Sequence, residues 1–265
     1  MSDDAYVALL DDLDAEESSL DATVADLDER DWSTPTPAEG WTVRDSIAHL
    51  AATEMWATLS LTDPDGFRAE LAGIADDAER RADEVRTGLM FRRPPPGIDT
   101  LTWWRDNRTR AGALLRTRDR ADRLPWFGPD MSSMSFATAR LMETWAHGVD
   151  VRDALGADTE PTDRLRQVAE LGVRTRGWSY VVRGREAPDV AVRVELDAPE
   201  GTRWVWGDAA APAWVRGPAL DFCLVVTQRR NLRDTALVVQ GEAAHEWLEV
   251  AQAFAGAATP PRPPS

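Results

Sequence analysis

The first part of the chain alternates apolar and polar positions with the period of an α-helix. One such segment, residues 140–156, ends at Gly156. Glycine readily adopts the left-handed conformation that closes many helices. The pattern therefore predicts helices throughout the first 160 residues or so. Apolar residues recur at helical spacing, between acids and arginines, in residues 5–30, 42–62, 67–90 and 99–117.

Turn-forming and capping residues set the expected ends of these helices. Thr42 and Asp45 have the spacing of a capping box, in which each side chain accepts a hydrogen bond from the backbone amide of the other residue. The sequence Asp63-Pro64-Asp65-Gly66 is expected to end the same helix, and the proline-rich run 93–97 interrupts the chain further on.

The pattern changes after residue 160. One more helix is expected over 162–182, and then alternation with a period of two predicts strands. The segment 219–231 fits either a short helix or a buried strand, and residues 242–256 read as a closing helix. We therefore predict an α+β protein of two domains, 1–160 and 161–257, with a disordered tail over 258–265. The strands are expected within 189–198, 202–208, 213–218 and 235–242.

The charge of the chain limits the kinds of molecule that we expect it to bind. The net charge is −16, which disfavours nucleic acid and anionic membranes. All 30 basic residues are arginine, which excludes a Schiff-base lysine and a phosphate-binding P-loop lysine.

The N-terminus does not resemble a signal peptide, and no apolar run reaches the ~20 residues of a membrane span. The single cysteine, Cys223, excludes an internal disulfide, so we expect a soluble, cytoplasmic protein.

Three polar residues in the helix predicted over 140–156 are the first candidates for chemistry. Glu143 and His147 are four residues apart, so they project from one helix face, and Asp150 follows one turn later. A carboxylate and an imidazole at this spacing can bind one cation together. His49, on the predicted helix 42–62, is the candidate for a third ligand, because bundles build metal sites from facing helices. A buried histidine paired with a carboxylate explains the same residues without a metal.

Two segments around these histidines resemble a known family. "DWSTPTPAEGWTVRDSIAHLA" and "ARLMETWAHGVDVRDALG" resemble two signatures of the DinB-like superfamily, in the actinobacterial branch that contains the mycothiol-dependent maleylpyruvate isomerases. The similarity extends over nearly the whole chain. The resemblance implies a four-helix bundle followed by a small α/β domain of sterol-carrier-like type. It also implies one divalent metal, usually zinc, bound by His49, Glu143 and His147.

The function implied by this resemblance is metal-dependent thiol chemistry. We expect an enzyme that activates a low-molecular-weight thiol, such as mycothiol, for transfer to or isomerisation of a small electrophilic substrate. A non-catalytic protein that binds a metal and a small molecule is the main alternative, and a purely structural bundle is the third. The expected partners are the thiol and the substrate, and the protein is expected to be a monomer or a homodimer.

Several further residues have a functional and a structural interpretation. Asp150 could orient His147 through its other ring nitrogen, or be a surface carboxylate. Glu54 lies within an apolar stripe, where it either faces the metal site or reaches the rim of the bundle. Arg105, or its neighbour Arg108, could bind a substrate carboxylate through two hydrogen bonds, or simply lie at the surface.

A loop before the helix over 140–156 could contribute to substrate binding. Trp126 and Met131 could form the wall of a pocket there, or only pack the loop onto the bundle. His245 is predicted to lie on the exposed side of the last helix and to bind no metal. Cys223 lies in an apolar segment and is expected to be a small buried residue rather than a reactive thiol.

Overall fold

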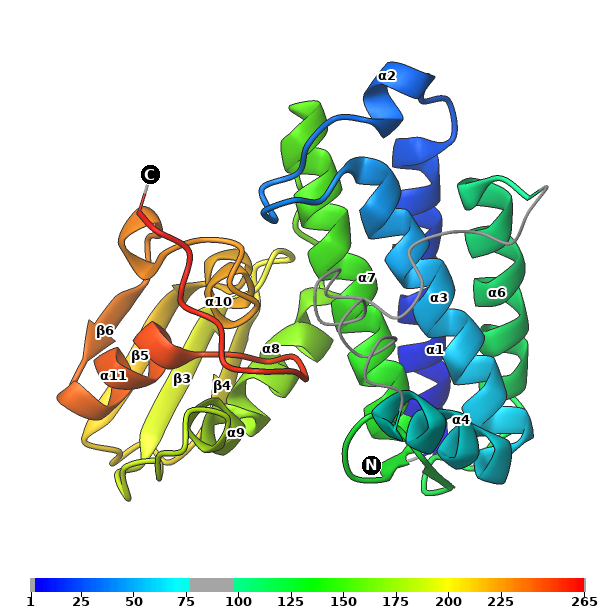
Figure 1. Ribbon diagram of the computed structural model, residues 1–265. Coiled ribbons are helices and arrows are strands. Elements are labelled where there is room, and N and C mark those ends of the chain that lie inside the picture. The colour runs from blue at the N-terminus through cyan, green and yellow to red at the C-terminus, as the bar shows by residue number, and fades with distance from the viewer. Residues whose placement is uncertain (1–2, 77–97, 265) are drawn as a thin grey trace. The chain divides into compact units, whose positions relative to one another are not determined.

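Figure 1 shows the computed structural model of the chain, which describes residues 3–76 and 98–264. Contacts along the chain separate two units, Met1–Thr159 and Glu160–Ser265. Residues 77–90 of the helix predicted over 67–90, and the proline-rich run 93–97, lie outside the described residues. Among the described residues, no helix is both long and apolar enough to cross a membrane.

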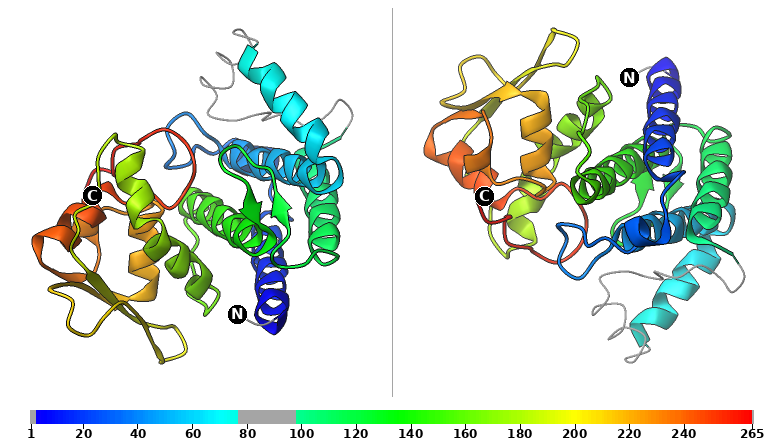
Figure 2. Two further views of the ribbon diagram at one scale, coloured as in Figure 1. Left: turned by 90° about the horizontal axis from the view of Figure 1, so that it is seen from below. Right: turned by 90° about the horizontal axis from the view of Figure 1, so that it is seen from above.

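Four long helices of the first unit pack side by side, and we call them the helix bundle. In this bundle α3 contacts both α6 and α7, and α1 contacts the same two helices. Figure 2 views the helices from their two ends. The helices of this unit are α1 (Asp3–Val24), α2 (Glu29–Trp32), α3 (Val43–Thr62), α4 (Pro64–Asp76), α6 (Thr100–Leu115) and α7 (Ser133–Leu155).

The apolar stripes predicted from the sequence form the core of this bundle. Leu9 and Leu20 of α1, Ile47 of α3 and Trp104 of α6 are all fully buried. The predicted capping box of α3 is confirmed, because Thr42 accepts a hydrogen bond from the Asp45 amide and the Asp45 side chain accepts one from the Thr42 amide. These caps fix where α3 starts, and so fix which of its residues face α7.

Helix α7 is longer than predicted at its N-terminus and ends where predicted. It follows a short antiparallel pair of strands, β1 (Arg123–Leu124) and β2 (Met131–Ser132). The Ser132 side chain accepts a hydrogen bond from the Ser135 amide, which explains the earlier start at Ser133. Gly156 adopts φ 66° at the C-terminus, as its position in the sequence predicted.

The second unit contains a four-stranded sheet and short helices. The strand order is β4-β3-β5-β6, with β3 and β5 parallel and the outer strands antiparallel to them. All four predicted strands form, and the ambiguous segment becomes helix α10. That this unit is a sterol-carrier-like domain stays a prediction. Its elements are α8 (Leu165–Arg174), α9 (Arg176–Val181), β3 (Val192–Asp197), β4 (Arg203–Trp206), β5 (Ala213–Pro218), α10 (Ala219–Val226), β6 (Val238–Gln240) and α11 (Glu242–Val250).

Two predicted boundaries in this unit are wrong. The helix expected over 162–182 breaks at Thr175 into α8 and α9, and the closing helix ends at Val250. The tail expected to be disordered makes hydrogen bonds as far as Arg262. The Thr259 carbonyl accepts one from Arg183 at 2.6 Å, and the Arg262 carbonyl accepts one from Asn231 at 2.6 Å. That residues 258–265 form a disordered tail stays a prediction.

Close packing of α8 against α10 gives a first testable prediction. A Cβ atom added at Gly172 would lie 2.7 Å from Cγ2 and 3.1 Å from Cβ of Val226, so one of the two helices would have to shift. We expect Gly172→Ala to lower the free energy of unfolding by about 1–3 kcal/mol in urea denaturation. Gly177→Ala in α9 is the control, because a Cβ there meets nothing within 4 Å. It should stabilise by up to about 1 kcal/mol, and equal effects of the two changes would contradict the packing argument.

Candidate metal site

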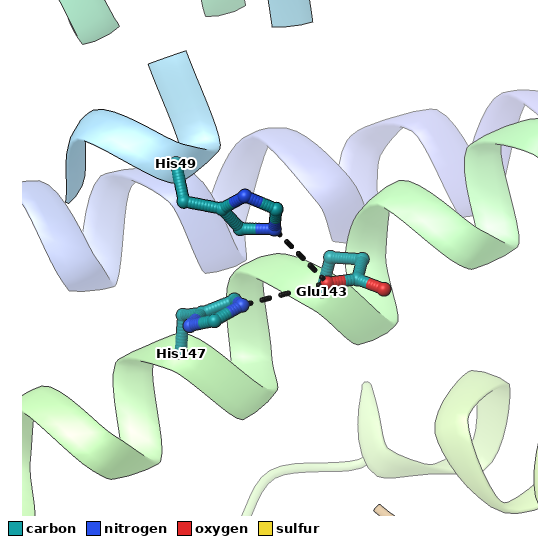
Figure 3. Close-up of side chains that lie close together, drawn as sticks. All are labelled: His49, Glu143 and His147. Atoms are coloured by element: carbon teal, nitrogen blue, oxygen red, sulfur yellow. Dashed lines mark ion pairs between the residues drawn. The ribbon is translucent and has the colours of Figure 1, made fainter. Parts of the chain in front are cut away.

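His49, Glu143 and His147 converge between α3 and α7. Figure 3 shows both imidazole rings directed at the Glu143 carboxylate. Glu143 and His147 project from one face of α7 because they are one helical turn apart, as the sequence predicted. His49 comes from the facing helix α3, so the three side chains meet only because these two helices pack together.

The distances within this group suit a shared cation. Nε2 of His49 lies 3.7 Å from Oε2 of Glu143, and Nε2 of His147 lies 3.5 Å from the same oxygen. Hydrogen bonds between N–H and oxygen usually span about 2.7–3.2 Å, so these pairs are too far apart for good ones. Two ligands that each lie about 2.0–2.1 Å from a tetrahedral zinc are roughly 3.3–3.4 Å from each other. The three ligand atoms lie within 4.8 Å of one another, so the group could hold a metal ion.

The protonation states also suit metal ligation. Burial lowers the pKa of His49 to about 4, so this imidazole is neutral near pH 7 and keeps a lone pair for a metal. Burial alone would raise the pKa of Glu143, but His147, His49 and Arg140 outweigh it and hold that pKa well below its usual range. Glu143 is therefore an ionised carboxylate between two imidazoles.

Trp41 packs against both imidazoles and was missed in the sequence. Its ring stacks on His147, with centroids 5.5 Å apart and planes 13° apart, and meets His49 edge-on at 5.6 Å. Its carbonyl accepts a hydrogen bond from the Thr36 amide at 2.8 Å, which fixes the loop that carries it. The available signal was its position directly before the capping residue Thr42, where the chain direction into α3 is set.

The predicted hydrogen bond between His147 and Asp150 is not formed. Asp150 is 1% exposed, so it is not a surface carboxylate either. Nδ1 of His147 and Nδ1 of His49 are both buried and have no hydrogen-bond partner among the described residues. The two rings instead pack against Trp41, and neither of the two interpretations of Asp150 describes its place in the structure.

A buried arginine and a buried glutamate lie next to these ligands. Nη1 of Arg140 on α7 lies 3.8 Å from Oε1 of Glu54 on α3, and the side chains are 4% and 3% exposed. Burial raises the pKa of Glu54 to about 7, against the opposing effect of Arg140. Of the two interpretations of Glu54, the structure favours the interior one. Arg140 was missed, although it is the one arginine that the sequence places in the apolar stretch directly before Glu143.

The two loop residues predicted to bind substrate differ in their surroundings. Trp126 lies over the Arg140 guanidinium, whose central carbon is 5.1 Å from the ring centroid, and it stacks on Phe67 at 5.9 Å. Trp126 therefore contacts Arg140, which lies near the metal ligands. Met131 lies in β2, paired with Leu124. For both residues a role in substrate binding stays a prediction.

Arg105 lies on a helix that carries none of the three ligands. Its guanidinium forms two hydrogen bonds of 2.8 and 2.6 Å with Asp21 of α1. Arg108 also binds Asp21, at 2.6 Å. Both guanidinium groups are therefore engaged within the protein, and the geometry gives no support to the predicted substrate-binding role of Arg105. His245 is exposed on α11.

Cys223 is fully buried in α10, where burial raises the pKa of its thiol far above the usual range. Its sulfur contacts the Leu165 carbonyl at 3.5 Å. A buried, protonated thiol is a poor nucleophile. Any thiol chemistry of this protein therefore requires a thiol supplied from outside.

Comparison with known proteins identifies the family. Residues 13–152, which include all three converging side chains, match the family described as the mycothiol maleylpyruvate isomerase N-terminal domain. The chain belongs to this family. The resemblance found in the two histidine-containing segments is thereby confirmed.

Other similar proteins extend the match to almost the whole chain. An uncharacterized protein from two strains of Mycobacterium tuberculosis is 45% identical over 245 residues, which is 92% of this chain and 94% of the relative. A crystal structure of the mycothiol-dependent maleylpyruvate isomerase superposes with a TM-score of 0.55 at 16% identity, covering 89% of this chain and 92% of that one. A histidine-to-alanine variant of that enzyme gives 0.53 at 16% identity, over 84% and 89% of the two chains. At this identity the structures show a shared fold.

Proposed function

We propose that this protein binds a divalent cation, in the first place zinc, through His49, Glu143 and His147. We further propose that it uses the cation to activate a low-molecular-weight thiol of the mycothiol type, for transfer to or isomerisation of a small electrophile. The observation that carries the proposal is the convergence of two imidazole nitrogens on one carboxylate oxygen, at 3.5 and 3.7 Å.

The donor set suits catalysis better than a closed structural site. Structural zinc sites have four protein ligands, whereas catalytic sites have three and leave a position for water or substrate. Among the described residues the group has three members. A cation held there would lower the pKa of an incoming thiol and keep its thiolate available near neutral pH.

The protein's own residues have distinct tasks in this proposal. Glu143 supplies the negative charge, and His49, neutral because it is buried, supplies a nitrogen ligand. Trp41 keeps both rings turned towards the carboxylate. Cys223 takes no part, because it is fully buried in α10. The partners are then a small thiol and a small substrate, in a reducing compartment such as the cytoplasm.

Turnover assays with and without metal test the proposal. Metal-free protein and protein loaded with zinc should be assayed with mycothiol and a panel of electrophiles that includes maleylpyruvate. We expect thiol-dependent turnover only in the loaded protein. In cobalt-substituted protein, added thiol should produce a thiolate-to-cobalt charge-transfer band. If the protein binds metal but shows neither that band nor turnover, the enzyme proposal is wrong. The alternative, a non-catalytic protein that binds a metal and a small molecule, would then remain.

A further inference from the structure

Arg140 is the buried cation closest in sequence to the metal ligands on α7. It precedes Glu143 by three residues, a rise of about 4.5 Å along the helix axis, so both project from a similar side of α7. Its charge also acts on His49, from the facing helix. Arg140 and the converging group therefore belong to one continuous polar region in the helix bundle.

The guanidinium of Arg140 is incompletely satisfied by the protein. Its Nη1 atom is buried and donates to no acceptor among the described residues. The Glu54 carboxylate, its ion-pair partner, is 3.8 Å away, beyond hydrogen-bonding distance. Buried polar groups are almost always hydrogen-bonded, so such a donor requires an explanation, and a ligand that supplies the missing acceptor is one.

The surroundings of Arg140 combine aromatic side chains with a guanidinium that has a donor unused by the described residues. Trp126 covers the guanidinium at 5.1 Å and itself lies in an aromatic cluster with Phe127 and Phe136. Binding sites for small molecules commonly combine apolar aromatic walls with a few polar groups that fix the ligand's orientation. The guanidinium is planar, and its forked donors match the two oxygens of a carboxylate.

We propose that Arg140, covered by Trp126, is the anchor for a carboxylate group of the substrate that reacts at the neighbouring metal site. The inference rests on the proposed function and adds to it the residue that orients the electrophile, through a carboxylate of that molecule. It also replaces Arg105, whose guanidinium is bound to Asp21, as the arginine that recognises this group.

Calorimetric titration with maleate tests the proposal, using the protein as purified and after zinc loading. Wild-type protein should bind maleate and should bind its neutral diamide at least ten-fold more weakly. Arg140→Gln should weaken maleate binding at least ten-fold, and Arg140→Lys, which keeps the charge but loses the fork, should have an intermediate effect. Arg105→Gln is the control and should bind maleate like wild type, because this exposed arginine is paired with Asp21.

Metal content and thermal unfolding of each variant separate the possible failures. An Arg140→Gln protein that keeps its metal and its fold but loses maleate binding supports the anchor. Equal binding of maleate and its diamide by wild type, or unchanged binding in folded Arg140→Gln, overturns it, as does loss of maleate binding only together with loss of metal. If wild-type protein takes up no metal, the proposed function is refuted, but the proposal for Arg140 is not. Its preference for maleate over the diamide can still be measured in that protein. If neither Arg140 variant folds, that wild-type comparison decides.

Discussion

Replacing His147 with alanine should lower zinc affinity by at least about 100-fold, and replacing His49 should do the same. Loss of the outer partners of metal ligands alone costs roughly 10–100-fold in affinity, so loss of a ligand should cost no less. The effect should be similar for the two histidines, because each is directed at the same Glu143 oxygen, at 3.5 and 3.7 Å. Competition with a chromophoric chelator at neutral pH measures the affinity, and elemental analysis measures the metal retained.

The chain contains a matched control for these substitutions. His245 is the third histidine of the sequence and is exposed on α11, so His245→Ala removes an imidazole without touching the proposed site. Its zinc affinity should equal that of wild type. Glu143→Gln keeps the size of the side chain and removes the charge, so it should resemble the histidine variants in metal content while retaining the fold.

Two results would contradict the ligand assignment. Metal content that stays unchanged in both His49→Ala and His147→Ala would show that any bound ion lies elsewhere. A loss of affinity in His245→Ala as large as in these variants would show that general damage, rather than loss of a ligand, explains the effect.

The sequence predicted the part of the site that lies on one helix. Glu143 and His147 are four residues apart, and any α-helix brings that spacing onto one face. The assignment of His49 needed more, because 94 positions separate it from Glu143 and only the packing of α3 on α7 brings them together. His49 was a candidate because bundles build metal sites from facing helices, and the family resemblance strengthened that assignment. Helical periodicity shows which face is buried but not which helix covers it.

The surroundings of the site depend on packing that periodicity does not encode. Trp41 lies in a loop, and its stacking on His147 follows from a turn fixed by backbone hydrogen bonds. Arg140 is buried in α7 beside Glu54, and its local sequence did not show that it faces the interior. The Asp150 prediction failed for the same reason, because spacing alone does not decide which side-chain atoms meet.

Helix ends were predicted correctly where the neighbouring residues form a cap. The predictions were wrong where no capping residue marks the end. Thr42 with Asp45, and Gly156, marked their helix ends correctly. The break at Thr175 has no such signature in the sequence, and no side chain caps α9 there. Capping residues in the sequence therefore determine some helix ends, and contacts within the second unit determine the others.

Glu54 is a buried acid whose titration should have a large effect on stability. It is 2% exposed, and burial raises its pKa to about 7 from the ordinary value of 4.5. Between these two pH values the folded protein holds a proton that the unfolded chain has released. Raising the pH through this window should therefore destabilise the protein, by up to about 3 kcal/mol at its upper end. His49, with a folded pKa of about 4 against 6.5, acts in the opposite direction, because its contribution to stability is lost as the pH falls.

Comparing the stability of wild type with that of Glu54→Gln separates the effect of Glu54 from the effect of His49. Glu54→Gln keeps the volume and the polar contact but does not titrate, and both proteins contain His49, so its contribution cancels. We expect the free energy of unfolding of wild type, relative to Glu54→Gln, to fall by about 3 kcal/mol as the pH rises from 4.5 to 7. Urea denaturation across this range, with a chelator in every sample so that metal does not contribute, measures the difference. A constant difference across the window would show that Glu54 ionises at an ordinary pH, and that Arg140 compensates for its burial fully.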